Sequence, residues 1–264
     1  MITKAFITLA FLLIIYLGFN SYAFAFSDRI LFPHVPPSYV KTEAIFFLQS
    51  RDGEQIAATY LPAKHSEQLL LYSHGNGEDI GHGLPLYQAF QSKGLSVLAY
   101  DYPGYGLSSG RASEKGVYAS IEAAYRYARG ELGYDASQII LYGRSVGSGP
   151  TCWMAEQETF AGIILDGAFT SAFRVVTGRK IVPWDKFDNL KRLHSIRSPV
   201  LLIHGTKDNV VPFSHAQKNY AAIQSPKQKL WIEGAKHNDH IRIAGERYWN
   251  TVMTFTKALK ASDQ

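Results

Sequence analysis

Residues 143–147 have the sequence Gly-Arg-Ser-Val-Gly and directly follow the apolar run 139–142. A serine with glycine two residues before it and two after it is typical of a nucleophile on a sharp strand-to-helix turn, because a Cβ at either glycine would clash there. The five-residue pattern also occurs by chance, so the apolar run before it and the small residues 148–150 after it carry the argument. The motif predicts acyl-transfer hydrolysis with Ser145 as the nucleophile.

A serine nucleophile needs an imidazole that takes its proton and a carboxylate that orients the imidazole. In a sheet whose catalytic loops lie at the carboxyl ends of the strands, both groups should follow strands downstream of the serine. Asp208 follows the apolar run 200–205 and is the first choice for the acid, with Asp166, at the end of an earlier strand, as the second. His237 follows the run 230–233 and is the first choice for the base.

Both choices have alternatives in the sequence. Asp208 taken alone would be an ordinary turn residue, and His215 and His240 compete with His237 as the base. Asp239 and His240 also suggest a metal site, but no further group of ligands has the spacing of a zinc site. The sequence therefore predicts neither a metal nor another cofactor.

Hydrolysis also needs backbone donors for the oxyanion of the tetrahedral intermediate. The N–H of Val146, at the start of the helix after the nucleophile, is one candidate. The second is the N–H of Asn76 in the sequence His-Gly-Asn-Gly, residues 74–77, which follows the strand-like run 69–73. The simpler interpretation of that loop is a glycine-rich turn.

Strand-like runs alternate with helical patterns along the chain, an order that predicts an α/β fold with a mostly parallel sheet covered by helices on both faces. The opening pair forms a hairpin around Asp52 and Gly53. We expect strands at 44–49, 55–61, 69–73, 96–100, 139–142, 162–166, 200–205 and 229–233, and helices at 86–92, 116–132, 149–155, from 213 onward and at 246–260.

The N-terminus forms a separate unit, in which Lys4 precedes an apolar segment that continues with little interruption to Phe26. The segment has about the 20 residues that span a bilayer, and Ala23 to Ala25 also has the small-x-small pattern of a signal-peptide cleavage site. We favour the uncleaved anchor. The predicted division is residues 1–26 as anchor or signal peptide and 27–264 as the hydrolase domain, which the positive-inside rule places on the non-cytoplasmic side, or exported (periplasmic or secreted) after cleavage.

The composition limits the possible partners. The chain has 264 residues, 46% of them hydrophobic, and a formal net charge of +5, so it can bury one substantial core. Its scattered Lys and Arg residues lack aromatic interleaving, which argues against a nucleic-acid partner and is compatible with anionic lipid. Cys152 is the single cysteine and excludes an intramolecular disulfide; we expect it to be buried and inert.

Five segments together resemble the α/β-hydrolase superfamily, and within it the membrane-anchored group of small serine hydrolases similar to protein depalmitoylases and prolyl-aminopeptidase-like hydrolases. The resemblance covers about residues 29–260. It implies an eight-stranded sheet with Ser145 as nucleophile, Asp208 as acid and His237 as base. The matching segments are His-Gly-Asn-Gly at 74–77, Asp-Tyr-Pro-Gly-Tyr-Gly-Leu-Ser at 101–108, Gly-Arg-Ser-Val-Gly at 143–147, His-Gly-Thr-Lys-Asp-Asn-Val-Val-Pro at 204–212 and Gly-Ala-Lys-His at 234–237.

Only about 34 residues separate Asp166 from Val200, too few for a multi-helix lid, so a minimal cap is expected. An open site favours substrates presented on a surface, such as lipids or acylated proteins. The segment 169–198 carries seven Lys and Arg residues against two Asp, together with Trp184, and predicts contact with an anionic bilayer or, more simply, a solvated polar cap.

The sequence favours a membrane-associated serine hydrolase that cleaves carboxylic ester or thioester bonds of acyl substrates through an acyl-enzyme. The alternatives are a serine peptidase acting on short peptides and a non-catalytic binding protein with the same fold. The presence of all three candidate triad residues and both oxyanion loops argues against the binding protein. The oligomeric state is left open.

Overall fold

The computed structural model describes residues 2–177 and 184–261. Eight strands form one sheet in the order β1-β2-β4-β3-β5-β6-β7-β8. Strand β2 is antiparallel to β1 and β4, and the other neighbours are parallel, which confirms the predicted sheet. The strands are β1 (Ile45–Gln49), β2 (Gln55–Leu61), β3 (Leu69–Ser73), β4 (Ser96–Tyr100), β5 (Ile139–Arg144), β6 (Gly162–Asp166), β7 (Val200–Gly205) and β8 (Lys227–Ile232).

Helices cover both faces of the sheet because the strands are apolar on both sides. Alternate residues of one strand enter different clusters: Leu69 and Leu71 pack with α3, α4 and α7, whereas Leu70 packs with α2 and α9. The helices are α1 (Ile2–Leu31), α2 (Ile80–Ser92), α3 (Glu114–Gly130), α4 (Ser148–Gln157), α5 (Ala172–Thr177), α6 (Asn189–Leu193), α7 (Phe213–Ala222), α8 (His240–Ala244) and α9 (Glu246–Ala261), with the 3-10 turns η1 (Ala136–Gln138) and η2 (Ser145–Gly147).

The differences from the predicted elements lie at ends and in short helices. Helix α2 begins at Ile80, before the predicted start at 86, because Asp79 caps it by accepting the N–H of His82 and the helix tolerates Pro85. Helices α5, α6 and α8 have five or six residues each, which is too short for a helical period to show in the sequence.

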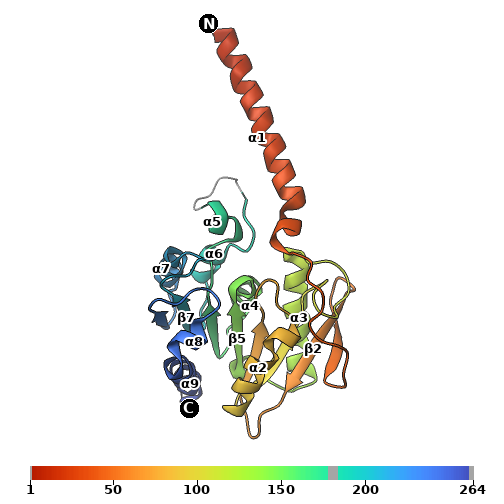
Figure 1. The fold of residues 1–264 in the computed structure, drawn as a ribbon, viewed down its shortest axis with the longest axis vertical. Coiled ribbons are helices and arrows are strands. Elements are labelled where there is room, and N and C mark those ends of the chain that lie inside the picture. Colours follow the sequence, from red (N-terminus) through yellow and green to blue (C-terminus); the bar gives the residue numbers. More distant parts are fainter. Residues whose placement is uncertain (1, 178–183, 262–264) are drawn as a thin grey trace.

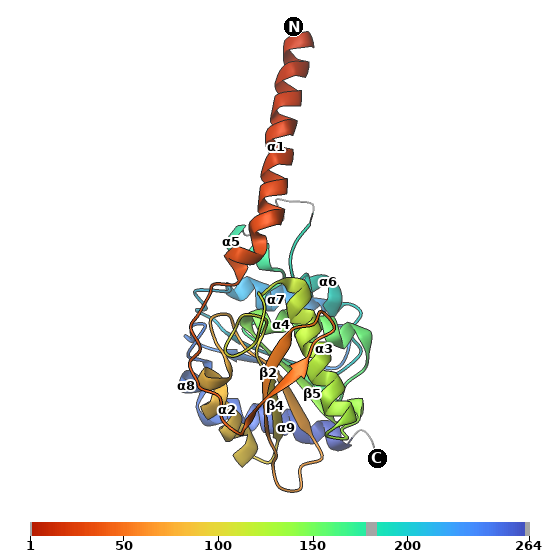
Figure 2. The same ribbon diagram turned by 90° about the vertical axis from the view of Figure 1, so that its right-hand side faces the viewer.

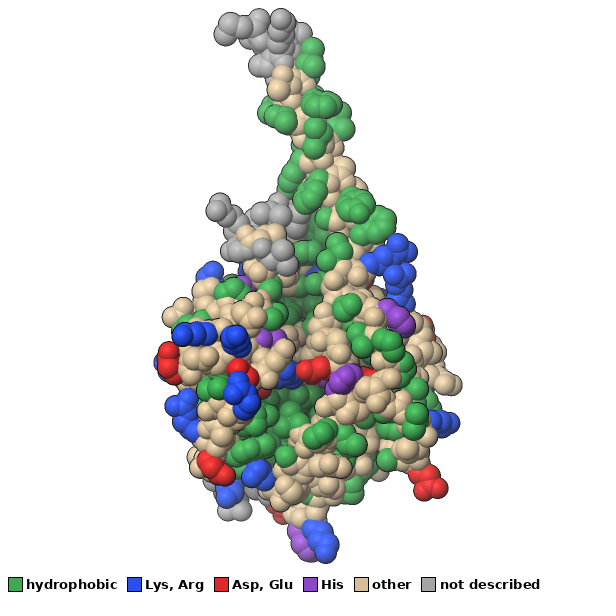
Figure 3. Space-filling model, in the orientation of Figure 1, with side chains coloured by type: hydrophobic (Ala, Val, Ile, Leu, Met, Phe, Trp, Pro, Cys, Tyr) green, Lys and Arg blue, Asp and Glu red, His purple; other side chains and the backbone are tan. Residues whose placement is uncertain are grey.

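Helix α1 rises away from the body (Figures 1 and 2). The stretch from Phe6 to Leu31 is long and apolar enough to cross a membrane, and none of its most apolar window is buried in the protein. Apolar side chains cover this helix along its length, whereas charged side chains are spread over the body (Figure 3). A helix that is apolar on all sides near the N-terminus fits a membrane anchor or a signal sequence.

The last turns of α1 are docked onto the body. The Phe24 ring meets Trp184 edge-on at a centroid distance of 5.3 Å, and Asp28 pairs with Lys186 at 3.0 Å. Phe32, just beyond the helix, is 7% exposed and packs against Phe187. These contacts fix the direction of α1 relative to the sheet.

The basic segment before β7 is largely neutralised where it is described. Arg174 lies 3.8 Å from Asp185, Lys186 pairs with Asp28, and Arg192 lies 3.4 Å from Glu156. Arg179 and Lys180, which the sequence analysis counted among the charges that could contact an anionic bilayer, lie outside the described residues. Three of the charges predicted to face a bilayer are thus held by carboxylates within the protein.

Cys152 lies in α4 and is fully buried, which raises the pKa of its thiol to about 12. Because the thiolate is the reactive form, the folded protein should resist 5,5′-dithiobis(2-nitrobenzoate) at pH 8 for hours. The unfolded chain should release one equivalent of thionitrobenzoate at once. Absorbance at 412 nm, with and without guanidinium chloride, tests this, and rapid labelling of the folded protein would contradict the burial of α4.

Candidate active site

The turn at Ser145, the predicted nucleophile, joins β5 to α4 through η2; residues 143–147 are called the nucleophile turn below. Ser145 has φ 51°, a left-handed conformation that is strained for a residue with a side chain. A Cβ on Gly143 would lie 2.6 Å from Thr151 Oγ1, and one on Gly147 would lie 2.1 Å from the Ser73 carbonyl oxygen. Both glycines are therefore required by the close approach of β3 and α4, as the motif predicts.

The three first-choice triad residues come together at the carboxyl edge of the sheet. His237 Nε2 lies 2.9 Å from Ser145 Oγ, and His237 Nδ1 lies 2.7 Å from Asp208 Oδ2. Ser145 follows β5, Asp208 follows β7 and His237 follows β8. With Nδ1–H donating to the carboxylate, Nε2 is free to accept the serine proton, which is the arrangement that general-base catalysis needs.

Asp208 is held as a carboxylate by its surroundings. Burial disfavours its charge, but hydrogen bonds from His237 and from the backbone N–H groups of Val210 and Val211 outweigh burial and lower the pKa of Asp208. His204 Nε2 also lies 3.3 Å from Asp208 Oδ2 and 2.9 Å from the Val211 carbonyl oxygen. The carboxylate is therefore fixed in position and ionised at neutral pH.

The alternative acid and bases have other partners. His240 Nδ1 lies 2.5 Å from Asp166 Oδ1, and its Nε2 accepts the backbone N–H of Gly205 at 3.1 Å. Tyr142 also donates to Asp166 at 2.7 Å. His215 Nδ1 accepts the N–H of Thr170. These groups brace β5, β6 and β7 against one another, and none of these contacts is made to Ser145.

The loop after β3 presents Asn76 beside the base of α1. The Gly75 N–H donates to Glu78 Oε2 at 2.9 Å, so this donor is already used. The Asn76 side chain donates to the Leu31 carbonyl oxygen and accepts the Tyr105 hydroxyl, each at 2.7 Å. Val146, the other predicted oxyanion donor, lies within η2 directly after the nucleophile.

An ion pair that the sequence analysis missed ties the candidate oxyanion loop to the candidate base loop. Arg144 donates to Glu78 Oε1 at 2.8 Å and to Asn238 Oδ1 at 2.9 Å. Burial opposes the charge of Arg144, but Glu78 raises its pKa above the ordinary value. In the sequence, Arg144 directly precedes Ser145 and Glu78 directly follows the glycine-rich loop. Nothing in the sequence indicates that the two residues pair, because only the fold brings them together.

Asp239 and His240 do not belong to a cluster of metal ligands among the described residues. Within residues 2–177 and 184–261, no three His, Cys, Asp or Glu side chains are grouped so that they could hold an ion. Asp239 accepts hydrogen bonds from Arg242 and from the Lys236 backbone, and His240 is paired with Asp166. The two residues that suggested zinc in the sequence thus have protein partners.

The fold is that of an α/β hydrolase. Residues 64–187 match the family model described as serine aminopeptidase, S33. The esterase Pf2001 of Pyrococcus furiosus superposes with a TM-score of 0.71 over 85% of this chain and 98% of that chain, at 18% identity. An alpha-beta serine hydrolase homologue of Coxiella burnetii gives a TM-score of 0.65 over 80% and 97%, at 23% identity. These structures show the shared fold.

Sequence similarity shows the family. Alpha/beta hydrolase domain-containing protein 17B of Homo sapiens is 38% identical over 198 residues, which are 74% of this chain and 69% of that protein. Protein 17C of Mus musculus is also 38% identical, over 199 residues that are 74% of this chain and 62% of that protein. The chain belongs to this family of α/β hydrolases and is a hydrolase enzyme, which confirms the resemblance found in the sequence.

The Gly147→Ala variant tests the packing of the nucleophile turn. Its Cβ would overlap a backbone carbonyl of β3, so we expect a loss of at least about 2 kcal/mol of stability, which is a fall of about 4 °C or more in Tm. Gly130→Ala is the matched control, because a Cβ there meets nothing within 4 Å at the end of α3. Thermal unfolding followed by circular dichroism in detergent measures both; equal Tm values would contradict the close approach.

Proposed function

We propose that the protein is a membrane-tethered serine esterase or thioesterase that cleaves acyl substrates through Ser145, His237 and Asp208. The observation that carries the proposal is the continuous hydrogen-bond chain from Ser145 Oγ through His237 to Asp208, beginning on a left-handed turn. A fold that only binds ligands needs neither this chain nor a strained serine.

In the proposed acylation step, Ser145 Oγ attacks the acyl carbon while His237 Nε2 takes its proton. Asp208 stabilises the imidazolium that forms. The N–H groups of Val146 and Asn76 donate to the oxyanion. When the tetrahedral intermediate collapses, the bond to the leaving alcohol or thiol breaks and His237 returns the proton to it, leaving the acyl group on Ser145.

In the proposed deacylation step, water replaces the leaving group. His237 takes a proton from the water as the water oxygen attacks the acyl-enzyme carbonyl, and it then protonates Ser145 Oγ as the ester bond to the serine breaks. The products are the carboxylic acid and the free enzyme. Esters and thioesters follow the same steps with an alcohol or a thiol as the first product, and no cofactor takes part.

The orientation of the candidate site supports an acyl substrate at a membrane. Asn76 follows the carboxyl end of β3 and contacts Leu31 at the end of α1, so the edge of the sheet that carries Ser145 faces the same side as α1. In both ribbon views α5, from the connection between β6 and β7, also lies beside the base of α1 (Figures 1 and 2). With α1 in a bilayer, this edge is turned toward acyl chains of membrane lipids or acylated proteins.

Peptidase activity is the second candidate, because the matching family model is described as a serine aminopeptidase. Binding a free amino terminus would require an unpaired carboxylate near the nucleophile. Glu78, the carboxylate joined to the candidate oxyanion loop, already pairs with Arg144 at 2.8 Å and accepts the Gly75 N–H. The pairing of this carboxylate favours acyl esters and thioesters over peptides.

Ser145→Ala should lower the hydrolysis of p-nitrophenyl acyl esters and of acyl-cysteine thioesters by at least about 1,000-fold, because the acyl-enzyme can no longer form. Ser92→Ala, at an exposed end of α2, is the control and should retain the full rate. Aminoacyl p-nitroanilides are assayed in parallel. Faster turnover of the anilides than of the acyl esters would favour the peptidase.

His237→Ala should be as inactive as Ser145→Ala, since triad residues act as one unit. His240→Ala should lose stability through Asp166 yet keep its reaction with a fluorophosphonate probe, because the ring nitrogens of His240 bond Asp166 and the Gly205 N–H, whereas Ser145 is bonded by His237. The rate of probe labelling, corrected for the folded fraction, separates the two. Activity lost only in His240→Ala would assign the base to His240, and no labelling of the wild type would favour a binding protein.

We also propose that residues 1–26 remain as an anchor and that the hydrolase domain lies on the non-cytoplasmic side. The orientation rests on Lys4 before the apolar segment, which favours a cytoplasmic N-terminus. The expected result is full-length protein in the membrane fraction, with the domain digested by protease added to the non-cytoplasmic face. A mature N-terminus at Phe26 would select the exported form, and digestion from the cytoplasmic face would reverse the orientation.

A further inference from the structure

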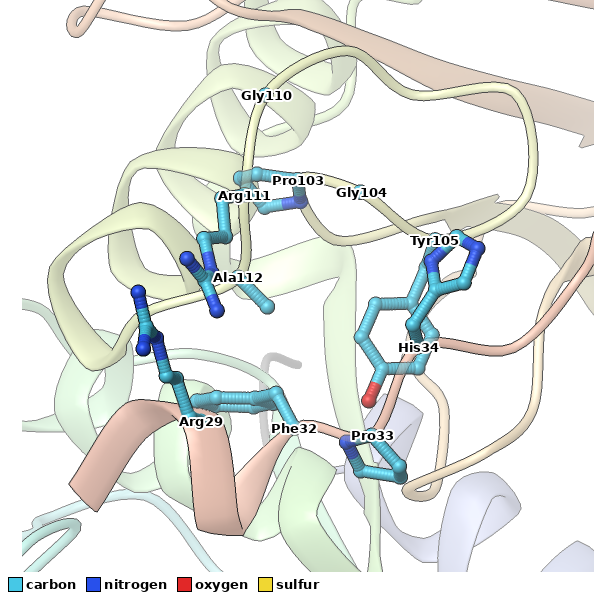
Figure 4. Close-up of a pocket in the computed structure, with 10 residues that line it drawn as sticks. All are labelled: Arg29, Phe32, Pro33, His34, Pro103, Gly104, Tyr105, Gly110, Arg111 and Ala112. Carbon is cyan, nitrogen blue, oxygen red and sulfur yellow. The ribbon is translucent and has the colours of Figure 1, made fainter. Parts of the chain in front are cut away.

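Two adjoining cavities lie where α1 meets the body. One has a volume of about 330 Å³, is open to the surface and is lined by the end of α1 and the loop from Pro103 to Ala112; the other, of about 430 Å³, lies between α1 and the start of α3. Both are lined by Arg29 and Arg111. In Figure 4 the two guanidinium groups lie on the same side of the first cavity, with His34 and Tyr105 on the other.

The two arginines carry charges that no described carboxylate neutralises. Within residues 2–177 and 184–261 neither forms an ion pair, although other basic groups near α1 do. Asp28, which lines the second cavity, is taken by Lys186 at 3.0 Å. Glu114 is bound by the Tyr118 hydroxyl and the Phe187 N–H. Two guanidinium groups that share a cavity without a counter-ion favour an anion, and their planar forks match the oxygens of a phosphate.

The length of α1 places this cavity at the depth of lipid phosphates. Lys4 is the first charged residue in the sequence of α1, and Arg29 is the basic residue of its last turn. The two positions are 25 residues apart. At about 1.5 Å per residue the separation is about 37 Å, which exceeds the hydrocarbon core of about 30 Å and falls short of the about 40–45 Å of a whole bilayer. Both charges would then lie in headgroup layers.

Aromatic residues support the same depth. Tyr22 stacks on Phe26 at 4.6 Å, Phe24 meets Trp184, and Arg29 lies over the Phe26 ring at 5.4 Å. Tyr and Trp concentrate where a membrane helix leaves the hydrocarbon. The cavity is lined by this last turn of α1, so with α1 in a bilayer it would lie in the headgroup layer next to the body.

We propose that this cavity binds the phosphate of an anionic membrane lipid, with Arg29 and Arg111 as its ligands. The proposal rests on α1 lying in a bilayer, as in the proposed function, but the site is separate from the acyl site at Ser145. Its wall includes Tyr105, whose hydroxyl donates to Asn76, so a bound lipid would lie one residue away from the candidate oxyanion loop.

The test uses full-length protein in a non-ionic detergent and measures Tm with short-chain phosphatidylglycerol, short-chain phosphatidylcholine or inorganic phosphate added. Wild type should gain about 3 °C or more from phosphatidylglycerol over phosphatidylcholine at saturation. The double variant Arg29→Gln/Arg111→Gln should lose that difference. Lys64→Gln/Lys257→Gln removes the same charge from exposed positions away from the cavity and should keep it.

Three results would overturn the proposal: the same gain from both lipids, loss of the gain in the lysine control, or a gain from inorganic phosphate equal to that from phosphatidylglycerol, which would indicate a site for a free anion. Arg111→Lys provides a second variant in case the double variant fails to fold, and it should weaken the gain because a point charge replaces the fork. Soluble ester hydrolysis, measured on every variant, should match wild type. An inactive wild type with a lipid-dependent Tm would refute the proposed function alone.

Discussion

The left-handed backbone at Ser145 is the constraint around which the rest of the chain is arranged. A residue with a side chain remains at φ 51° only if its surroundings leave no alternative, and here β3 and α4 close on the turn from two sides. That closure is possible because Gly147 lets the turn approach the Ser73 carbonyl and Gly143 lets it approach α4. The energy that holds the turn therefore comes from the packing of β3 and α4, and this turn places the half-buried serine hydroxyl within hydrogen-bond distance of His237.

The loops that carry Asp208 and His237 must be held at the same edge of the sheet as Ser145 without covering the serine. Buried polar groups hold them there. Asp166 joins Tyr142 of β5 to His240 of α8, while His240 receives the Gly205 N–H at the end of β7. Arg144 joins Glu78 to Asn238 on the solvent side. Removing one residue of such a network leaves its partner buried without a hydrogen bond, which costs the desolvation free energy of that partner. These residues therefore restrain the loops more strongly than the net free energy of each hydrogen bond suggests.

The sequence was sufficient to select candidate residues that follow a local pattern, but it missed contacts that depend on residues distant in the chain. Ser145, Asp208 and His237 each follow a short apolar run, so their strands and the edge they share could be inferred from hydrophobic pattern and spacing. Asp166 ends a strand as well, but the sequence alone could not show that its carboxylate is hydrogen-bonded to Tyr142 and His240. The pairing of Arg144 with Glu78 spans 66 residues and has no local pattern that would reveal it.

The end of α1 lies next to the candidate active site. Many hydrolases of this fold use an inserted lid to enclose the substrate, whereas the described part of the connection from β6 to β7 holds only α5 and α6. In this chain the end of α1 occupies the rim instead: Phe32 packs against Phe187 in that connection, and Leu31 accepts a hydrogen bond from Asn76. Because this part of the rim is continuous with α1, it cannot close over a substrate without moving α1 itself. If α1 lies in a bilayer, as in the proposed function, the same contacts turn the edge of the sheet that carries Ser145 toward the membrane, so the proposed anchor and the proposed acyl specificity support each other.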